Sequence, residues 1–261
     1  MKMGIVEKHA AGTVCWAELG TRDAEGAKRF YRGLFGWELE DLPIGGGSFY
    51  TMARLQGCDA AALYQTGHED GLLPARWRIH VSVPDVDVAA RRACDRGARM
   101  AVAPSDVPGA GRFALLRDAT GAHIGIWQAD GHIGAEVLGL PGALAWSELV
   151  TREVDTAKRF YGDWLDWESH TLEPGSYALF LKGGHPVAGM IRMAEERIDA
   201  ASHWRVYFQT EDCGASVGKA LRLGGTCVMP PTPIPGLGTV ALLTDPQGGF
   251  FALMQSSSGS G

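Results

Sequence analysis

Hydrophobic and polar positions near the start of the chain alternate with two different periods. Residues 12–20 alternate at every second position, which is typical of a strand with one buried face. The apolar residues that follow recur every three or four positions: Ala27, Phe30, Tyr31 and Leu34. This spacing predicts an amphipathic helix over 23–34, with Asp23 or Thr21 available to cap its first turn.

The patterns that follow complete a repeated order of elements. Three short strands are expected after the helix, at 36–41, 48–54 and 59–65. A second round starts with a strand at 77–83 and a helix that Asp85 caps and Gly97 ends. Three more strands are expected near 100–103, 112–117 and 122–128. The order is βαβββ twice, which predicts helices on one face of a curved mixed sheet. The other face must meet a second sheet or form a cup.

Self-comparison shows that this whole series occurs a second time in the chain. The segment 21–31 recurs as 151–161, and both copies end in Ala-Lys-Arg-Phe-Tyr. The same offset of 130 residues aligns Trp16 with Trp146. Two copies of one sequence predict two copies of one fold.

Further along the chain, the offset between the two copies becomes 127 residues. It aligns Trp77 with Trp204 there, so loops were deleted from the second copy between the two blocks. We therefore expect two homologous domains, over 10–130 and 141–256, joined by a linker over 130–140.

Taken together, these motifs resemble the vicinal oxygen chelate superfamily, which includes glyoxalase I, bleomycin-resistance proteins and extradiol dioxygenases. The resembling pieces are the Thr-x-Asp helix start with Ala-Lys-Arg-Phe-Tyr, Leu-Phe-Gly-Trp over 34–37, and Asp-x-x-Gly hairpins that begin at Asp118 and Asp245. The resemblance covers nearly the whole chain. It implies an α+β fold of tandem glyoxalase-like domains, each with two βαβββ units that form a curved mixed β-sheet cup with helices outside. It says less about function, because this fold hosts many activities.

The resemblance also places the metal ligands of the family, which are usually His, Gln or Glu. Two of the ligand positions in each domain fall on Trp16 and Arg78, and on Trp146 and Arg205. The other positions fall on Gly125 and Ala252, and near Ala61–Ala62 and Ala188–Gly189. None of these side chains can bind a divalent cation, because Trp and Arg offer only hydrogen-bond donors. We therefore expect no metal site and no cofactor, which argues against glyoxalase I and extradiol dioxygenase activity.

Strand alternation, in the register that the resemblance implies, gives the side chains that face each cup. In domain 1 they are Trp16, Glu18, Arg78, His80, Ser82, His123 and Trp127. In domain 2 they are Trp146, Glu148, Arg205, Tyr207, Gln209, Phe250 and Met254. A slip of one residue would turn each set outward. Because Tyr207 replaces His80, the cups should differ in chemistry: domain 1 is favoured for proton transfer and domain 2 for aromatic or apolar binding.

The two Glu–Arg pairs have two interpretations. Glu18 beside Arg78 could act as a general base next to a cation that holds a developing oxyanion. Alternatively, each pair neutralises two otherwise costly buried charges and has no chemical role. The second interpretation is favoured because the pair recurs as Glu148 with Arg205 and so follows the fold.

The aromatic and histidine residues are also open to more than one interpretation. His80 and His123 could form an acid–base pair or could be hydrogen-bonded pocket residues without chemistry. Four aromatic side chains could stack on a flat ligand or could fill the core: Trp16, Trp127, Trp146 and Phe250. The other histidines, His132 among them, have no partner at ligand spacing and are interpreted as surface or otherwise satisfied residues.

Composition narrows the classes of partner. The net charge of −6 argues against a protein that binds nucleic acid or an anionic membrane through a general basic face. No apolar run approaches the roughly 18–20 residues of a spanning helix, and no secretory signal is visible. The five Cys residues form no CxxC pair, which fits free thiols in a reducing compartment. We expect a cytoplasmic monomer or homodimer whose partner is a small molecule.

Two functions remain after these exclusions. The first is metal-independent binding of a hydrophobic or aromatic small molecule, as in the drug-resistance members of the superfamily. The second is a cofactor-independent lyase, isomerase or cyclase that acts on an aromatic or carbonyl natural product. Glu18 or His80 would then be the base and Arg78 the oxyanion partner. A metal enzyme with ligands at other positions is the least favoured alternative.

Overall fold

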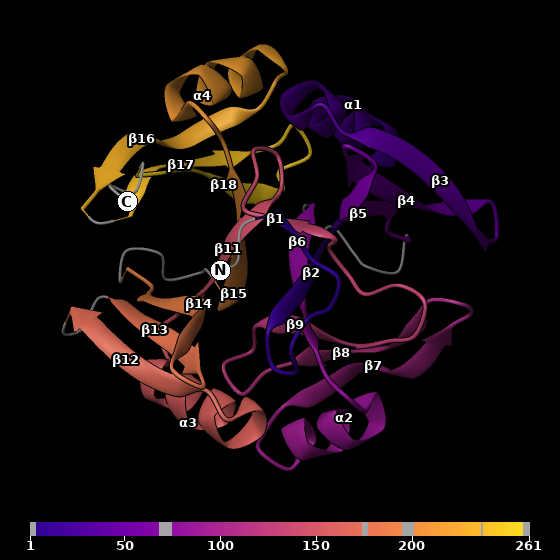
Figure 1. The fold of residues 1–261 in the computed structure, drawn as a ribbon, viewed down its shortest axis with the longest axis vertical. Coiled ribbons are helices and arrows are strands. Elements are labelled where there is room, and N and C mark those ends of the chain that lie inside the picture. Colours follow the sequence, from indigo (N-terminus) through magenta and orange to yellow (C-terminus); the bar gives the residue numbers. More distant parts are fainter. Residues whose placement is uncertain (1–3, 68–74, 174–176, 195–200, 236, 258–261) are drawn as a thin grey trace.

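Each of the two copies of the repeat forms one curved sheet of eight strands, which confirms the predicted pair of glyoxalase-like domains. The two sheets lie side by side with helices around them (Figure 1). The structure is a computed structural model that describes residues 4–67, 75–173, 177–194, 201–235 and 237–257.

Domain 1 contains two βαβββ units that share one sheet. Its elements are β2 (Val14–Thr21), α1 (Ala24–Phe35), β3 (Glu38–Gly45), β4 (Ser48–Leu55), β5 (Cys58–Gln65), β6 (Arg76–Ser82), α2 (Val86–Cys94), β7 (Arg99–Val107), β8 (Gly111–Arg117) and β9 (His123–Ala129). The strand order is β3-β4-β5-β2-β6-β9-β8-β7, so the first strands of the two units, β2 and β6, pair at the centre. They run antiparallel, while β2 with β5 and β6 with β9 run parallel. The sheet is mixed, as predicted.

Domain 2 repeats this arrangement strand for strand. Its elements are β11 (Leu144–Thr151), α3 (Val154–Leu165), β12 (Glu168–Glu173), β13 (Tyr177–Lys182), β14 (His185–Arg192), β15 (His203–Gln209), α4 (Cys213–Arg222), β16 (Thr226–Ile234), β17 (Gly238–Thr244) and β18 (Phe250–Ser256). The strand order is β12-β13-β14-β11-β15-β18-β17-β16, so β11 and β15 occupy the centre. The same backbone frame therefore presents both sets of cup-facing residues.

The helices begin where the sequence predicts. The Asp23 carboxylate accepts a hydrogen bond from the Gly26 amide at 2.8 Å, and Asp85 accepts one from the Val88 amide at 2.9 Å. Each carboxylate satisfies an amide in the first turn that has no partner within the helix. The strand expected near 100–103 proves longer, because β7 extends to Val107. It is an exposed edge strand that pairs only with β8, so its sequence lacks a clear buried face.

A small sheet that joins the start of the chain to the linker was not predicted. β1 (Gly4–Ile5) pairs antiparallel with β10 (Val137–Leu138), which lies between the two domains in sequence. Two residues are too few for alternation to be recognised in a sequence. Just before β10, the Ala135 amide donates to the Cys15 carbonyl and the Glu136 amide donates to the Asp59 carbonyl. The linker is thereby bound to β2 and β5 of domain 1, whose cup is called cup 1 below, and the cup of domain 2 is called cup 2.

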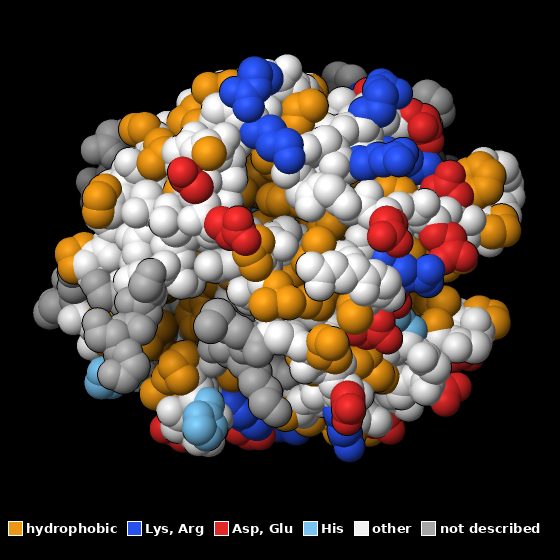
Figure 2. Space-filling view, turned by 45° about the horizontal axis from the view of Figure 1, so that its top comes forward, with side chains coloured by type: hydrophobic (Ala, Val, Ile, Leu, Met, Phe, Trp, Pro, Cys, Tyr) orange, Lys and Arg blue, Asp and Glu red, His pale blue; other side chains and the backbone are white. Residues whose placement is uncertain are grey.

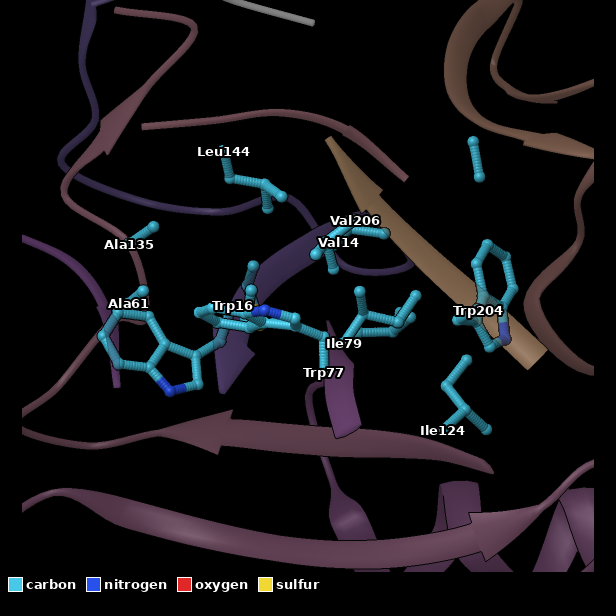
Figure 3. Close-up of a cluster of buried hydrophobic side chains, with 14 of the residues drawn as sticks. Val14, Trp16, Ala61, Trp77, Ile79, Ile124, Ala135, Leu144, Trp204 and Val206 are labelled. Carbon is cyan, nitrogen blue, oxygen red and sulfur yellow. The ribbon is translucent and has the colours of Figure 1, made fainter. Parts of the chain in front are cut away.

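The convex faces of the two sheets meet at the centre of the molecule. Trp77 of β6 packs against Phe208 of β15 with ring centroids 5.0 Å apart. Figure 3 shows this apolar cluster, to which Ile79 contributes from β6 and Trp204 and Val206 from β15. Side chains alternate along a strand, so the residues between these core positions point away from the interface. The interface therefore fixes the register that turns the predicted site residues into the cups.

Two reciprocal hydrogen bonds connect each helix to the hairpin of the other domain. The Tyr31 hydroxyl of α1 donates to Asp245 at 2.9 Å, and the Tyr161 hydroxyl of α3 donates to Asp118 at 2.5 Å. All four side chains are buried. The repeated Phe-Tyr and Asp-x-x-Gly motifs therefore belong to the domain interface and not to a cup.

The surface carries charges of both signs. On the face drawn in Figure 2, side chains of both charges are scattered, with Lys and Arg most frequent toward the top, and apolar atoms are exposed across the middle. Among the described residues, no helix is long and apolar enough to cross a membrane.

Candidate functional site

Strand register places the predicted charged residues of cup 1 in contact. Glu18 on β2 is the direct partner of Arg78 on β6, and Trp16 is the partner of His80. The Arg78 guanidinium donates to Glu18 Oε1 at 2.8 Å, and His80 Nε2 lies 3.1 Å from the same oxygen. Glu18 and His80 are only 7% and 4% exposed. The predicted catalytic residues thus form one buried cluster.

Two tyrosines that the sequence analysis missed complete this cluster. The Tyr50 hydroxyl of β4 donates to Glu18 Oε2 at 3.0 Å and accepts from Trp16 Nε1 at 2.8 Å. The Tyr64 hydroxyl of β5 accepts from Arg78 at 2.9 Å. The carboxylate therefore has a partner on each oxygen, as a buried charge requires.

These contacts hold the Glu18 carboxyl in its ionised form. Burial by itself raises the pKa of the Glu18 carboxyl, but His80, Arg78 and the Tyr50 hydroxyl lower it to about 2. A carboxylate with so low a pKa is charged at neutral pH and is a weak base. The pair is therefore better suited to holding a fixed pattern of charge than to removing a proton.

The remaining predicted residues of cup 1 lie along β6 and β9. His123 is half-buried, and burial together with Arg76, Arg117 and Arg78 lowers its pKa to about 4. It is neutral at pH 7, and no contact between it and His80 is observed among the described residues. Ser82 and Trp127 are register partners near the linker, where Trp127 Nε1 donates to the His132 carbonyl at 2.8 Å.

Cup 2 contains the equivalent Glu–Arg pair with a different neighbour. Glu148 pairs with Arg205 across β11 and β15, and the two side chains approach to 3.2 Å. The Tyr207 hydroxyl donates to the same Glu148 oxygen at 2.7 Å and lies 3.3 Å from Arg205 Nη1. Where cup 1 has an imidazole, cup 2 therefore has a phenol.

The rest of cup 2 is aromatic and apolar. Trp146 Nε1 donates to the Tyr177 hydroxyl at 3.2 Å, and the Arg205 guanidinium carbon lies 5.4 Å from the centre of the Phe250 ring. Gln209 lies near the end of the cup and accepts from Ser256 at 3.1 Å. One apolar cluster, separate from the main core, contains Trp146, Tyr207, Val240, Ala252 and Met254. Met254 was placed in this cup from sequence, but Tyr177 was not.

Glu148 responds to its surroundings in the opposite direction from Glu18. Burial raises the pKa of the Glu148 carboxyl, and Arg205 with the Tyr207 and Tyr177 hydroxyls offsets this only in part. The phenol of Tyr207 carries no charge that could stabilise the carboxylate. A proton is therefore held more readily on the carboxyl of cup 2 than on that of cup 1.

The positions that the family resemblance assigns to metal ligands do not fit a metal here. A side chain at Gly125 would overlap the His80 ring, and one at Gly189 would overlap the Tyr177 hydroxyl. Arg78 and Arg205 place a positive charge beside the carboxylate that remains in each cup. Within the described part of the chain, no group of three His, Cys, Asp or Glu side chains could hold a metal ion.

Several buried polar atoms in the cups have no hydrogen-bond partner. They include Nδ1 and Nε2 of His80 and the Nε atoms of Arg78 and Arg205. His80 Nε2 makes its ion-pair contact with Glu18 without the alignment of a hydrogen bond. Unpaired buried polar atoms are uncommon in proteins, so each cup retains capacity to bind a polar group.

Comparison with known sequences matches most of the chain to one family and to proteins of similar length. A family model described as glyoxalase-like domain matches residues 14–126 and 147–254. CFP32 of Mycobacterium bovis, provisionally named a glyoxylase, is 36% identical over 95% of this chain and 96% of its own length. DauV of Streptomyces sp. (strain C5), named an anthracycline biosynthesis protein, is 31% identical over 95% of this chain and 94% of its own length.

Solved structures share the fold at low sequence identity. The Mn(II)-bound glyoxalase from Novosphingobium aromaticivorans superposes with a TM-score of 0.63 at 13% identity, over 97% of this chain and 83% of that one. The 2,3-dioxygenase LapB from Pseudomonas sp. KL28 also has a TM-score of 0.63, at 14% identity, over 98% of this chain and 94% of its own. These likenesses show the fold alone.

Proposed function

Because the chain belongs to the glyoxalase-like domain family, we propose that it binds a hydrophobic or aromatic small molecule without a metal. The observation that carries this proposal is the replacement of the metal-ligand positions in both cups. The His80 ring and the Tyr177 hydroxyl occupy the space that a ligand side chain at Gly125 or Gly189 would need, and the carboxylate of each cup is paired with an arginine. A pocket with apolar walls and a few unpaired polar atoms suits an organic ligand.

The relatives suggest the class of ligand. DauV carries the name of an anthracycline biosynthesis protein and matches nearly the whole of this chain. Anthracyclines are flat aromatic molecules with hydroxyl and carbonyl oxygens. Trp146 and Trp16 could stack on such rings, and the arginine in each cup could pair with an oxygen. We therefore propose a hydroxylated aromatic natural product as the ligand.

We also propose where the protein is located and how it assembles. We place the protein in the cytoplasm, where its five free cysteines would remain reduced. One chain already contains two cups, so neither cup needs a second copy to be complete. We expect a monomer or a homodimer with no requirement for a nucleic acid or membrane partner.

The second candidate is a cofactor-independent lyase, isomerase or cyclase in cup 1. One observation favours it: both ring nitrogens of the buried His80 lack a hydrogen-bond partner and could exchange a proton with a substrate. Glu18 is the weaker candidate for the base because of its low pKa. Arg78 would hold the developing oxyanion.

Binding and its independence from metal can be tested together. Protein treated with a strong chelator would be titrated with a dihydroxyanthraquinone, and quenching of tryptophan fluorescence would be followed. We expect saturable binding that Mn²⁺, Fe²⁺ or Zn²⁺ does not change by more than about twofold, a small free-energy difference. Binding that appears only after a metal is restored would contradict the proposal.

The same samples distinguish binding from catalysis. Ligand recovered from the complex would be compared with the starting compound by mass spectrometry and by its absorption spectrum. Unchanged ligand supports the binding function. Turnover that is lost in His80→Gln and retained in Tyr207→Phe would favour the second candidate instead.

A further inference from the structure

We propose that the ligand of this protein occupies cup 2, and that the linker of the chain itself closes cup 1. In this arrangement the His132 ring takes the position of a ligand ring between Trp16 and Trp127. The inference rests on the proposed binding function and adds which cup performs it and how the ligand is oriented there.

The His132 ring lies against both tryptophans of cup 1. It meets the Trp16 ring edge to face, with centroids 4.8 Å apart and an interplanar angle of 86°. It lies 5.8 Å from the Trp127 ring at 69°. These are the geometries that aromatic pairs prefer. From sequence, His132 was interpreted as a surface or otherwise satisfied residue; its ring has a partner in Asp59 and also lies against the proposed stacking surface.

Several contacts hold the linker in this position. The amides of Asp130, Gly131 and His132 all donate to the Ala110 carbonyl at 3.0 Å. His132 Nδ1 lies 3.3 Å from Asp59, and Trp127 donates to the His132 carbonyl. Gly134 has a φ of 99° and passes so close to the Cys15 carbonyl that a side chain would overlap it. The backbone contacts hold the linker itself in place, and moving the ring out of the cup would also break its contact with Asp59, so we expect cup 1 to stay closed.

Cup 2 has no equivalent plug within the described residues. No aromatic ring stacks on Trp146 or meets it edge to face there, although its indole N–H binds the Tyr177 hydroxyl. The offset that aligns Trp77 with Trp204 aligns His132 with Gly259, which has no side chain and lies outside the described residues. Trp146 is also more exposed than Trp16, at 9% against 4%, so among the described residues its ring is the better placed of the two to meet a ligand ring.

Charge and packing orient the ligand in cup 2. Arg205 and the Tyr207 and Tyr177 hydroxyls are grouped around Glu148, and Arg205 Nε is buried without a partner. Apolar side chains pack in the same cluster as Trp146 and Tyr207: Val240, Leu242, Met229, Leu179 and Met254. Methionine side chains adapt to irregular aromatic surfaces. A flat polycyclic ligand would therefore enter with a phenolic or carbonyl oxygen toward Arg205 and its rings beside Trp146.

Matched tryptophan variants test the choice of cup. Trp146→Ala and Trp16→Ala would each be titrated with the dihydroxyanthraquinone after chelator treatment. We expect Trp146→Ala to weaken binding about tenfold, the loss of one stacking contact, and Trp16→Ala to stay within about twofold of the unsubstituted protein. Trp146→Phe and Trp16→Phe keep an aromatic ring in place if either alanine variant fails to fold, which circular dichroism would reveal.

The outcomes separate this inference from the proposed function. A tenfold loss in Trp16→Ala with full binding by Trp146→Ala would overturn the choice of cup and leave the binding function standing. No saturable binding by the unsubstituted protein would overturn both. Calorimetry should give one ligand per chain. Two equivalent ligands per chain would show that cup 1 is open.

Discussion

The two cups share one backbone frame but use their carboxylates differently. Each has a buried Glu–Arg pair at the same register position, formed by Glu18 with Arg78 and by Glu148 with Arg205. The pKa of Glu18 is lowered to about 2, whereas the pKa of Glu148 is raised. The difference teaches that a duplicated fold can keep its ion pair and still change its chemistry through the neighbour of the carboxylate.

A single backbone position accounts for much of this difference. His80 lies against Gly125, where an added side chain would overlap its ring. The equivalent partner of Tyr207 is Ala252, so an imidazole could not take the same position in cup 2. The phenol of Tyr207 contacts the carboxylate through its hydroxyl instead. The ring and the residue beneath it must therefore change together.

Removal of each carboxylate should have the largest effect and should differ between the cups. Glu18→Gln would leave Arg78 buried without its counter-charge, at a cost of about 3 kcal/mol in the free energy of unfolding at pH 7. Glu148→Gln also leaves Arg205 without its counter-charge but should cost less, about 2 kcal/mol, because the raised pKa of Glu148 means that its charged form is less strongly stabilised. Urea denaturation would measure both values. Equal losses would contradict the comparison.

Exchange of the ring next to the carboxylate should be the next largest effect. Tyr207→His should destabilise the protein by about 2 kcal/mol, because the imidazole meets Ala252 and a hydrogen bond to Glu148 is lost. Adding Ala252→Gly should recover about half of that and lower the pKa of Glu148 toward that of Glu18. Carboxyl chemical shifts followed against pH would show this change. An unchanged Glu148 pKa in the double variant would contradict the role given to the imidazole.

Much of the fold and part of the site could be predicted from the sequence. The fold could be predicted from the repeat and from the helix caps at Asp23 and Asp85. A side-chain period of two leaves only two choices of face for Trp16, Glu18 and Arg78, and the family resemblance indicated which of the two faces the cup. These features are local, so a single sequence contains them.

The missed residues reach the cups through tertiary structure. Tyr50 and Tyr64 come from β4 and β5, whose inward reach depends on how the sheet curves. His132 comes from a linker with no periodic pattern to interpret. One signal was present: the offset that aligns Trp77 with Trp204 also aligns Tyr50 with Tyr177. Both tyrosines bind the indole N–H of their cup's tryptophan.

The domain interface should respond symmetrically, unlike the cups. Tyr31→Phe and Tyr161→Phe each remove a buried hydroxyl that donates to an aspartate of the other domain and accepts from a tryptophan, Trp77 or Trp204. Each change should cost about 1.5 kcal/mol. Thermal or urea unfolding would give the two values. A difference above about 1 kcal/mol would show that the two halves of the interface are not equivalent.

The smallest predicted effect concerns His123 of cup 1, whose place in cup 2 is taken by Phe250. Its folded-state pKa of about 4 lies below the ordinary value of 6.5, so the unfolded chain binds the proton first. Stability from neutral His123 is therefore present above pH 6.5 and is lost as the pH falls toward 4. His123→Phe, which copies Phe250 of cup 2, should reduce this loss by about 1 kcal/mol, after allowance for partial exposure. Denaturation curves at pH 7 and pH 4.5 would measure it, and an identical loss in both proteins would contradict the assignment.

The most direct test of the difference between the cups is the indole N–H spectrum of the ¹⁵N-labelled protein. The chain has 8 tryptophans. The signals of Trp146, Trp16 and Trp127 would be assigned with single Trp→Phe variants. A dihydroxyanthraquinone added to chelator-treated protein should move the Trp146 signal and leave those of Trp16 and Trp127 in place. Movement of the Trp16 and Trp127 signals with a static Trp146 signal would contradict the account.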